Sequence, residues 1–236
     1  RNILFNTNMA IAQRGTSSSG ITNSYVYRTV DRFVTDISGA AVVTESQVSD
    51  NPLNNGKSLK VDVTTADTSL AANDNYSIYT KLEGYDLQRF KKGTASAKKF
   101  SLSFFVKTNK TGTYVVSLRD QDNSRKVSAT YTVSDSNWNR YTLTFPADTT
   151  GAFGDDNGES LMIIWWLGAG SNYSSGSLPT TWASGSNNEA AGGVNFMDST
   201  SNDFQITNVQ LEAGDFCTEY EPPRSYGEEL KRCERY

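Results

Sequence analysis

The segment Lys99-Phe-Ser-Leu-Ser-Phe-Phe-Val-Lys107 decides the fold class, because its apolar and polar residues alternate. Successive side chains of a β-strand point to opposite faces of the sheet, so this alternation predicts a strand with one apolar face. The apolar face carries Phe100, Leu102, Phe104 and Val106. Such a strand is typical of an antiparallel sheet that covers a core on one side and faces water on the other.

Three segments that follow repeat the alternation and are separated by turn-forming residues. The expected strands are 114–120, 125–133 and 140–146. The first two are preceded by Asn109-Lys-Thr-Gly112 and Asp122-Asn-Ser, whose residue types favour tight turns. Four strands joined by short turns predict an antiparallel meander.

The rest of the chain extends this pattern. Further strands are expected at 32–38, 40–48, 58–65, 76–82, 160–167 and 203–211. The segment Tyr85-Asp-Leu-Gln-Arg-Phe90 is too short for a stable isolated helix and is expected to form a turn. About nine to eleven strands with frequent Gly, Asn, Ser and Asp turns predict an all-β fold, a two-sheet antiparallel β-sandwich.

A single sandwich domain is expected at residues 1–221, because sandwiches of this length are often undivided. The remaining residues, 222–236, form a tail. Helical spacing is confined to 226–236, where Tyr226, Leu230 and Cys233 share one stripe. The tail is therefore expected to be a short helical or extended segment.

The charge balance argues against binding to polyanions. The 236 residues include 22 basic and 26 acidic ones, and the net charge is -4. The chain thus has no electrostatic reason to bind nucleic acid or an anionic membrane. No apolar stretch approaches the roughly 18 residues that span a bilayer, so no membrane insertion is expected. Lys91-Lys92 and Lys98-Lys99 flank a turn and are expected to be solvated.

The cysteines and the start of the chain bear on its processing. Cys217 and Cys233 are the only two cysteines, which does not indicate a disulfide framework. Cys217 is expected to be a small buried apolar residue. The sequence starts at Arg1 without an initiator methionine or a signal peptide, so the chain is expected to be a fragment or a processed product.

Catalysis is not expected. The sequence has no histidine, which removes Ser-His and Cys-His nucleophiles and the commonest zinc ligand. Glycoside hydrolysis needs two carboxylates, and Asp155, Asp156 and Glu159 lie within reach of one another. The alternative is a polar loop that is simply solvated, and this interpretation is preferred.

No cofactor or metal site is assigned. A structural calcium ion would need Asp31, Asp36, Asp62 and Asp203 to converge from separate strands. The sequence has no Asp-x-Asp-x-Asp-Gly loop, which is the local pattern of oxygen ligands for calcium. Structural calcium therefore stays an alternative without a defined site.

Both ends of the chain carry recognisable motifs. The closing segments are Ile206-Thr-Asn-Val-Gln-Leu-Glu-Ala-Gly-Asp, Tyr220-Glu-Pro-Pro-Arg-Ser-Tyr and Arg232-Cys-Glu-Arg-Tyr236. The opening segments are Asn2-Ile-Leu-Phe-Asn, Met9-Ala-Ile-Ala-Gln-Arg-Gly-Thr and Tyr27-Arg-Thr-Val-Asp-Arg-Phe. In their order and spacing they closely resemble the jelly-roll domain of tail-fibre and other virion proteins of bacteriophages, notably marine ones.

That resemblance implies a fold, a location and partners. It implies a jelly roll of the kind shared with carbohydrate-binding modules, in which Asn2-Ile-Leu-Phe-Asn begins a first strand and Gln13-Arg-Gly forms a turn. It also implies a structural protein of the virion, in the tail or a surface appendage. Its partners would be two further copies in a homotrimer, other virion proteins and a host cell-surface glycan.

Candidate glycan contacts lie at the end of the chain's most apolar strand. Adjacent Trp165 and Trp166 must point to opposite faces, and Trp165 is expected in the core. Trp166 then lies on the outer face with Met162 and Ile164, which must be covered by the following loop, by another subunit or by a ligand. The loop, 168–201, has no strand pattern, and segments of this length are either mobile or functional.

Three loop residues complete the candidate glycan site with Trp166: Asn172, Tyr173 and Trp182. Aromatic rings stack against the C–H faces of pyranoses, while asparagine meets their hydroxyl groups. The alternative is that the rings only pin the loop to the sheet. In the tail, Tyr226, Leu230 and Cys233 are candidate trimer contacts, because the stripe is too narrow to bury within one subunit, while Glu229, Arg235 and the other charged residues stay in water.

Two other functions remain open. The chain can be a carbohydrate-binding module of a secreted polysaccharide-degrading enzyme, which would share the fold and the aromatic platform. It can also be an architectural capsid, fibre or baseplate component without a glycan site.

Overall fold

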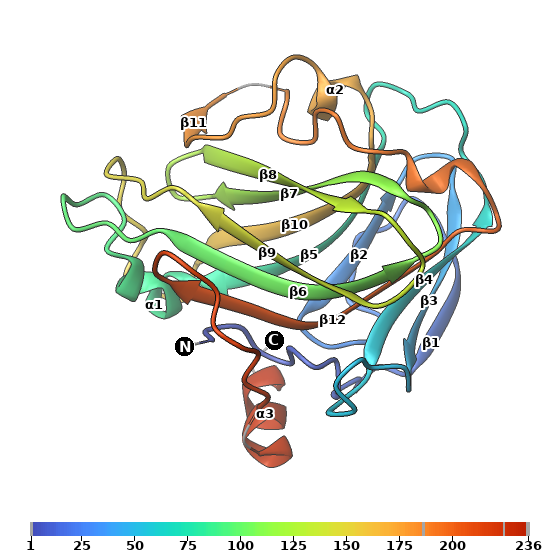
Figure 1. The fold of residues 1–236 in the computed structure, drawn as a ribbon, viewed down its shortest axis with the longest axis horizontal. Helices are drawn as coiled ribbons and strands as arrows, with labels where there is room; N and C mark the ends of the chain where they lie inside the picture. Colours follow the sequence, from blue (N-terminus) through green and yellow to red (C-terminus); the bar gives the residue numbers. More distant parts are fainter. Residues whose placement is uncertain (1, 186, 224, 235–236) are drawn as a thin grey trace.

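The computed structural model describes residues 2–185, 187–223 and 225–234, and it confirms the expected two-sheet antiparallel sandwich of jelly-roll type (Figure 1). In order across the sheet, sheet A consists of β1 (Ser17–Ile21), β3 (Val42–Val48), β4 (Ser58–Thr65), β12 (Asp203–Ala213), β6 (Phe100–Thr108) and β9 (Asn139–Phe145). Sheet B consists, in the same way, of β11 (Ala183–Ser184), β8 (Arg125–Val133), β7 (Gly112–Asp120), β10 (Glu159–Ala169), β5 (Asn75–Glu83) and β2 (Phe33–Ser38).

The helices are short and lie between or beyond the strands. They are α1 (Gly84–Leu87) and η1 (Gln88–Phe90) after β5, α2 (Ser171–Ser174) and η2 (Phe196–Asp198) between β10 and β12, and α3 (Tyr226–Cys233). Within the described ranges, no helix has the length and apolar character needed to cross a membrane. The expected turn at 85–90 is thus α1 with η1, held by Phe90, whose ring stacks on Phe100 at 4.0 Å.

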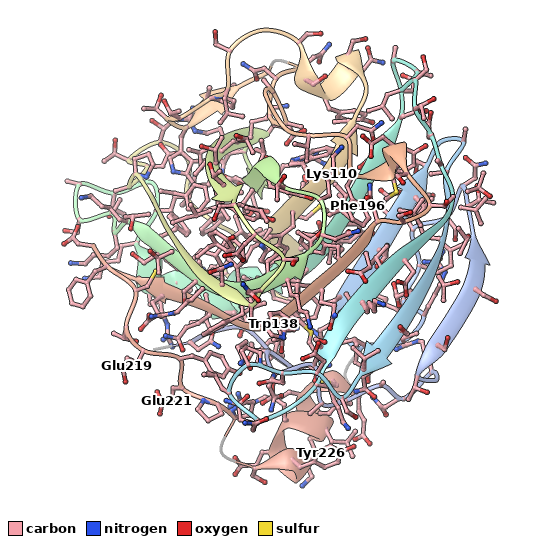
Figure 2. All side chains as sticks on the ribbon, turned by 45° about the vertical axis from the view of Figure 1, so that its right-hand side comes forward. Lys110, Trp138, Phe196, Glu219, Glu221 and Tyr226 are labelled. Carbon is pink, nitrogen blue, oxygen red and sulfur yellow. The ribbon has the colours of Figure 1, made fainter. Side chains whose placement is uncertain are left out.

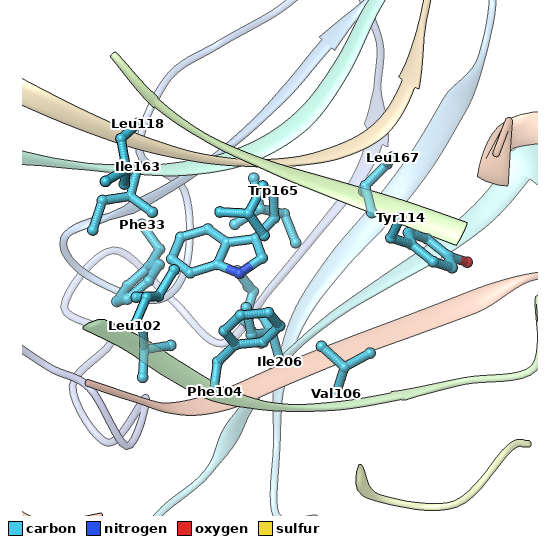
Figure 3. Packing of buried hydrophobic residues seen from close by; sticks show 14 of the residues in the cluster. Phe33, Leu102, Phe104, Val106, Tyr114, Leu118, Ile163, Trp165, Leu167 and Ile206 are labelled. Carbon is cyan, nitrogen blue, oxygen red and sulfur yellow. The ribbon is translucent and has the colours of Figure 1, made fainter. Parts of the chain in front are cut away.

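The core lies between the sheets and is built from the apolar faces of alternating strands (Figure 3). Phe100, Leu102, Phe104 and Val106 are all buried there, as their alternation predicts. Trp165 is fully buried, with its ring edge-on to Phe104 at 5.7 Å and tilted against Phe33 at 6.4 Å. Aromatic pairs of this geometry add about 0.5–1.5 kcal/mol beyond the effect of burial.

The expected four-strand meander is wrong. β6 pairs with β12 and β9 in sheet A, whereas β7 pairs with β10 and β8 in sheet B, so the chain changes sheet after β6 and again after β8. Residues 109–111 suffice for the first change, because packed sheets lie about 10 Å apart and three extended residues span that distance. Alternation shows which face of a strand is apolar but not which sheet the strand joins.

The N-terminal segment is not the strand that the resemblance implied. Residues 2–6 lie outside any strand, but they run beside β12, which has a bulge between Thr207 and Gln210. Asn2 donates its side-chain amide to the Val209 carbonyl at 3.0 Å and accepts the Leu211 N–H at 3.0 Å. The pairing of β12 with β4 covers Asp203–Ile206, and the backbone groups of Val209 and Leu211 lie beyond it, so one asparagine replaces part of the ladder there. β1 and β11 do not show the alternation that predicts a strand, because β1 is short and Ser-rich and β11 has only two residues.

The Val-Gln-Leu-Glu motif holds the C-terminal exit segment against sheet A. The buried carboxylate of Glu212 accepts the backbone N–H of Thr218 at 2.9 Å and its hydroxyl at 2.8 Å. Burial alone would raise the pKa of Glu212, but these hydrogen bonds outweigh it and lower the pKa. Gln210 accepts the N–H of Glu221 at 3.0 Å. The exit segment, marked by Glu219 and Glu221 in Figure 2, thereby leads to α3.

The tail forms α3 but does not present the expected stripe. Cys233 is 1% exposed within a single chain and Leu230 is half-buried, so only Tyr226 of the three is largely exposed. Glu229, which was expected in water, is buried and accepts the backbone N–H of Asn6. The N-terminal segment lies against this face of the helix (Figure 1), where Arg232 is also 5.5 Å from the Phe5 ring. Arg235 lies outside the described residues, and the trimer stays a prediction.

Tyr131 provides a test of the core. Its ring contacts Phe104 at 5.1 Å, but its buried hydroxyl has no hydrogen-bond partner among the described residues, and burial raises the pKa of Tyr131 well above its usual value. An unsatisfied buried polar group costs about 1–3 kcal/mol, so Tyr131→Phe is expected to raise the free energy of unfolding in urea by about 1 kcal/mol. Tyr114→Phe is the control and should lower it, because the Tyr114 hydroxyl donates to the Lys110 carbonyl at 2.8 Å. A less stable Tyr131→Phe protein would contradict the prediction.

Candidate functional site

The face of sheet B that points away from the core carries a second apolar layer. Trp166, Met162 and Ile164 of β10 face outward, as expected from the alternation with buried Trp165. Met162 lies between Lys81 of β5 and Arg119 of β7. Ile164 lies between Tyr79 and Ser117, and Trp166 between Ser77 and Val115. Apolar groups therefore occupy the middle of this face, and charged groups lie at one end of it.

The segment 168–201 covers one part of this face. Trp166 is only 3% exposed, because the Tyr173 ring packs on it at a centroid distance of 5.4 Å. The indole N–H of Trp166 donates to the Ser117 hydroxyl at 2.8 Å. Trp166 is therefore fully engaged inside the protein, which agrees with the interpretation that this ring pins the loop to the sheet.

Glu189 attaches the same segment to sheet B through both its backbone carbonyl and its side-chain carboxylate. Its carbonyl oxygen accepts the hydroxyls of Ser117 at 2.7 Å and Ser128 at 2.8 Å. Its buried carboxylate lies 2.6 Å from an Arg119 nitrogen and 3.6 Å from Lys126 Nζ. The loop is thus bonded to β7 and β8 along the line where it crosses them.

Trp182 lies elsewhere and is also buried, with 8% of its surface exposed. Its ring packs on Phe100 at 5.5 Å, inside the main core, and its N–H donates to the Pro146 carbonyl at 2.8 Å. Trp182 therefore does not complete a platform with Tyr173. Asn172 is exposed and donates its side-chain amide to Asn73. Of the four candidate glycan residues, Asn172 and half-buried Tyr173 reach the surface, and their glycan role stays a prediction.

A tyrosine cluster that sequence reasoning missed lies beside the covered part. Tyr25 is 65% exposed, and its backbone carbonyl lies 3.4 Å from the Tyr79 hydroxyl. Tyr27 is half-buried and packs against the outer apolar layer of sheet B. Burial raises the pKa of Tyr79, and the neighbouring Asp36 and Tyr27 add to this effect. The sequence feature that could have indicated this cluster is Tyr25-Val-Tyr27, in which one residue separates two tyrosines shortly before a strand.

Polar groups surround these rings. Asp36 is buried and accepts the Ser38 hydroxyl at 2.6 Å and the Asn75 amide at 3.0 Å. Burial raises the pKa of Asp36, although the Ser38 hydroxyl and the positive charges of Arg28 and Arg119 act in the opposite direction. Charged groups of both signs therefore act on one another beside Tyr79, and a hydroxyl-rich ligand requires both hydrogen-bond donors and acceptors.

Two of the three carboxylates considered for hydrolysis, Asp156 and Glu159, make local contacts. Asp156 accepts the N–H of Gly158 at 2.8 Å within its own loop. Glu159 lies 2.7 Å from Lys81 Nζ and accepts the Gln121 amide at 3.0 Å. Asp156 lies in a polar loop, whereas Glu159 begins β10, and the absence of catalysis stays a prediction.

The four aspartates considered for calcium do not converge. Asp62 and Asp203 are neighbours across β4 and β12, but Lys60 lies between their carboxylates at 2.8 and 3.4 Å. Asp31 instead faces Arg14 at 3.2 Å. Within the part of the chain that the structure describes, no group of three or more His, Cys, Asp or Glu side chains is placed to hold a metal ion.

Sequence comparisons and structural comparisons give different results. No protein-family model matches the sequence, and no curated protein matches it. The solved structures that the fold resembles include the enzymatically active domain of tailspike protein 4 of bacteriophage CBA120, with 15% identity and a TM-score of 0.45 over 90% of this chain. The chain spans about a fifth of that domain, 21% of its length.

Two further likenesses are to carbohydrate-binding modules. The family 11 module of a cellulosomal cellulase of Clostridium thermocellum has 14% identity and a TM-score of 0.41, over 92% of this chain and 96% of the module. A family 30 module has 12% identity and a TM-score of 0.42, over 98% of this chain and 94% of the module. Likenesses at this level support no inference about a shared ligand or activity.

Proposed function

We propose that this chain binds a glycan without cleaving it, on the outer face of sheet B beside Tyr25. The observation that carries the proposal is the largely exposed side chain of Tyr25, whose backbone carbonyl lies 3.4 Å from the Tyr79 hydroxyl. Buried Asp36 acts electrostatically on Tyr79, and the positive charges of Arg28 and Arg119 act on Asp36. A flat ring supplies a stacking surface for a sugar, and the surrounding charged groups supply directional hydrogen bonds. Tyr79 and Tyr27 are packed against the sheet, and they therefore hold the loop that carries Tyr25 in place.

The biological setting that we propose is host attachment by a bacteriophage. The chain would be a domain of a tail fibre or similar virion protein, assembled as a homotrimer with other virion proteins. The support is the resemblance at both chain ends, whose segments also meet in space, with Asn2 bonded to β12. Single sugar sites bind weakly, and several linked copies raise avidity by about 10²–10⁴-fold without any new contact.

The expected result for Tyr25→Ala is a loss of at least about tenfold in glycan affinity, or about 1.4 kcal/mol. Its melting temperature should stay at the wild-type value, because the ring is mostly exposed. A glycan array with wild-type protein identifies the ligand, and calorimetry then compares the variants. Tyr85→Ala is the matched control, because Tyr85 is also an exposed tyrosine but belongs to α1.

Two outcomes would contradict the proposal. Either the array shows no binder at protein concentrations that detect millimolar affinity, or Tyr25→Ala binds as well as wild type. The solution mass tests the setting separately. A trimer supports the fibre, whereas a monomer that binds glycan supports a module of a secreted polysaccharide-degrading enzyme.

A further inference from the structure

Lys92 departs from the solvated turn that its sequence context predicts, because its side chain is 0% exposed. It lies just after η1, at the end of the sandwich where the β7–β8 turn and the residues after β9 meet. Burying an ammonium group away from water costs several kcal/mol, which only well-placed oxygen atoms offset. The surroundings of Lys92 therefore need to be unusually rich in oxygen.

Four oxygen atoms surround the ammonium group. Lys92 Nζ lies 2.6 Å from the Asp120 carboxylate and 3.0 Å from that of Asp148. It also donates to two consecutive carbonyls, of Thr150 at 2.9 Å and Gly151 at 2.8 Å. Gly151 has a φ of 70°, a conformation that side chains rarely adopt, and a Cβ there would lie 2.4 Å from the Asn123 side chain. Glycine thus allows both carbonyls to face the same cation.

Charge balances within this cage, which we define as the oxygen atoms of Asp120, Asp148, Thr150 and Gly151. Arg125 donates to Asp148 at 2.7 Å and offsets one of the two carboxylates, and Lys92 offsets the other. Burial alone would raise the pKa of Asp148, but the hydrogen bonds from Arg125 and Lys92 lower it. The rings of Trp182 and Phe153 lie 5.2 and 5.3 Å from the ammonium and cover the cage.

Two carboxylates and two backbone carbonyls are the ligand set by which proteins hold hard cations. The contact distances of 2.6–3.0 Å are hydrogen-bond lengths for an ammonium donor. Because Arg125 already offsets one of the two carboxylates, the cage calls for a cation with a single charge. We infer that this cage is a cation-binding site which the chain fills with its own ammonium group, and that it takes up K⁺ or an alkylammonium ion once the lysine side chain is removed.

The test compares two replacements of the same lysine. Lys92→Ala leaves the cage open, whereas Lys92→Met fills it with an apolar chain of similar length. Thermal unfolding of each is measured in KCl, in methylammonium chloride and, at equal ionic strength, in tetramethylammonium chloride, whose cation is too bulky and has no N–H to donate. Lys91→Ala is the matched control, because the neighbouring Lys91 is exposed.

We expect the melting temperature of Lys92→Ala to be higher in methylammonium or K⁺ than in tetramethylammonium, by about 5 °C or more. A ligand that is present at a concentration well above its Kd stabilises the folded protein by this order of magnitude. Wild type, Lys92→Met and Lys91→Ala should show no such difference. If Lys92→Ala does not fold unaided, its recovery on refolding in the same salts replaces melting as the readout. Equal behaviour in all three salts, or the same rise for Lys92→Met, would overturn the inference and leave an ordinary buried ion pair.

Discussion

Trp182→Ala is expected to lower the free energy of unfolding by about 3–5 kcal/mol, as for other large aromatic residues truncated in a core. The ring packs on Phe100 in the main core and covers the ammonium group of Lys92, and its N–H satisfies the Pro146 carbonyl. Truncation removes all three contacts and opens a buried charge to water. Urea denaturation followed by fluorescence or circular dichroism measures the loss.

Tyr173→Ala is the informative comparison for Trp182→Ala, because the sequence predicted one glycan platform from both residues and the structure places them apart. Tyr173 is half-buried and contacts Trp166, so its truncation should cost less stability than that of Trp182. A Trp182→Ala protein with wild-type stability and impaired glycan binding would contradict the structural role. It would also restore Trp182 to the sugar-binding surface.

The sequence predicts well which face of each sheet is buried, because the alternation of apolar and polar residues shows the direction in which the side chains of a strand point. Leu102 and Phe104 are buried on one side of β6, and Trp165 and Trp166 separate to opposite faces of β10, as period-two alternation requires. The same alternation does not show which strands pair with each other. β6 and β7 are consecutive and similar in pattern, yet they belong to different sheets.

The site is less predictable because the exposure of a loop residue depends on what folds over it. Trp182 and Tyr25 both lie in polar loops, but the first is buried in the core and the second is largely in water. Lys92 sits in a basic turn and would be solvated if Asp120 and Asp148 did not arrive from distant strands and loops. Local composition therefore identifies candidate side chains, and only the tertiary structure assigns them to binding or to stability.

Glu189→Ala is expected to release the loop from the outer face of sheet B and to cost about 2–3 kcal/mol. Removing one partner of a buried ion pair costs about 3–5 kcal/mol, and the lower figure applies here because Arg119 and Lys126 retain some contact with water. The Glu189 carboxylate holds both of these cations, which lie on neighbouring strands. Without it, the two cations repel each other beneath the loop.

Because the loss is local, hydrogen exchange should separate it from global unfolding. Amides of 171–185 and 187–191 are expected to exchange faster in Glu189→Ala, while the exchange rates of β6 and β12 amides stay at their wild-type values. Limited proteolysis should cut the same segment first, since a detached loop exposes Trp166 and Tyr173. Glu228→Ala, at an exposed position of α3, is the control and should change stability by no more than about 0.5 kcal/mol. Uniform acceleration of exchange across both sheets would show instead that Glu189 supports the whole sandwich, and the loop would then be an integral layer of the fold with no independent motion.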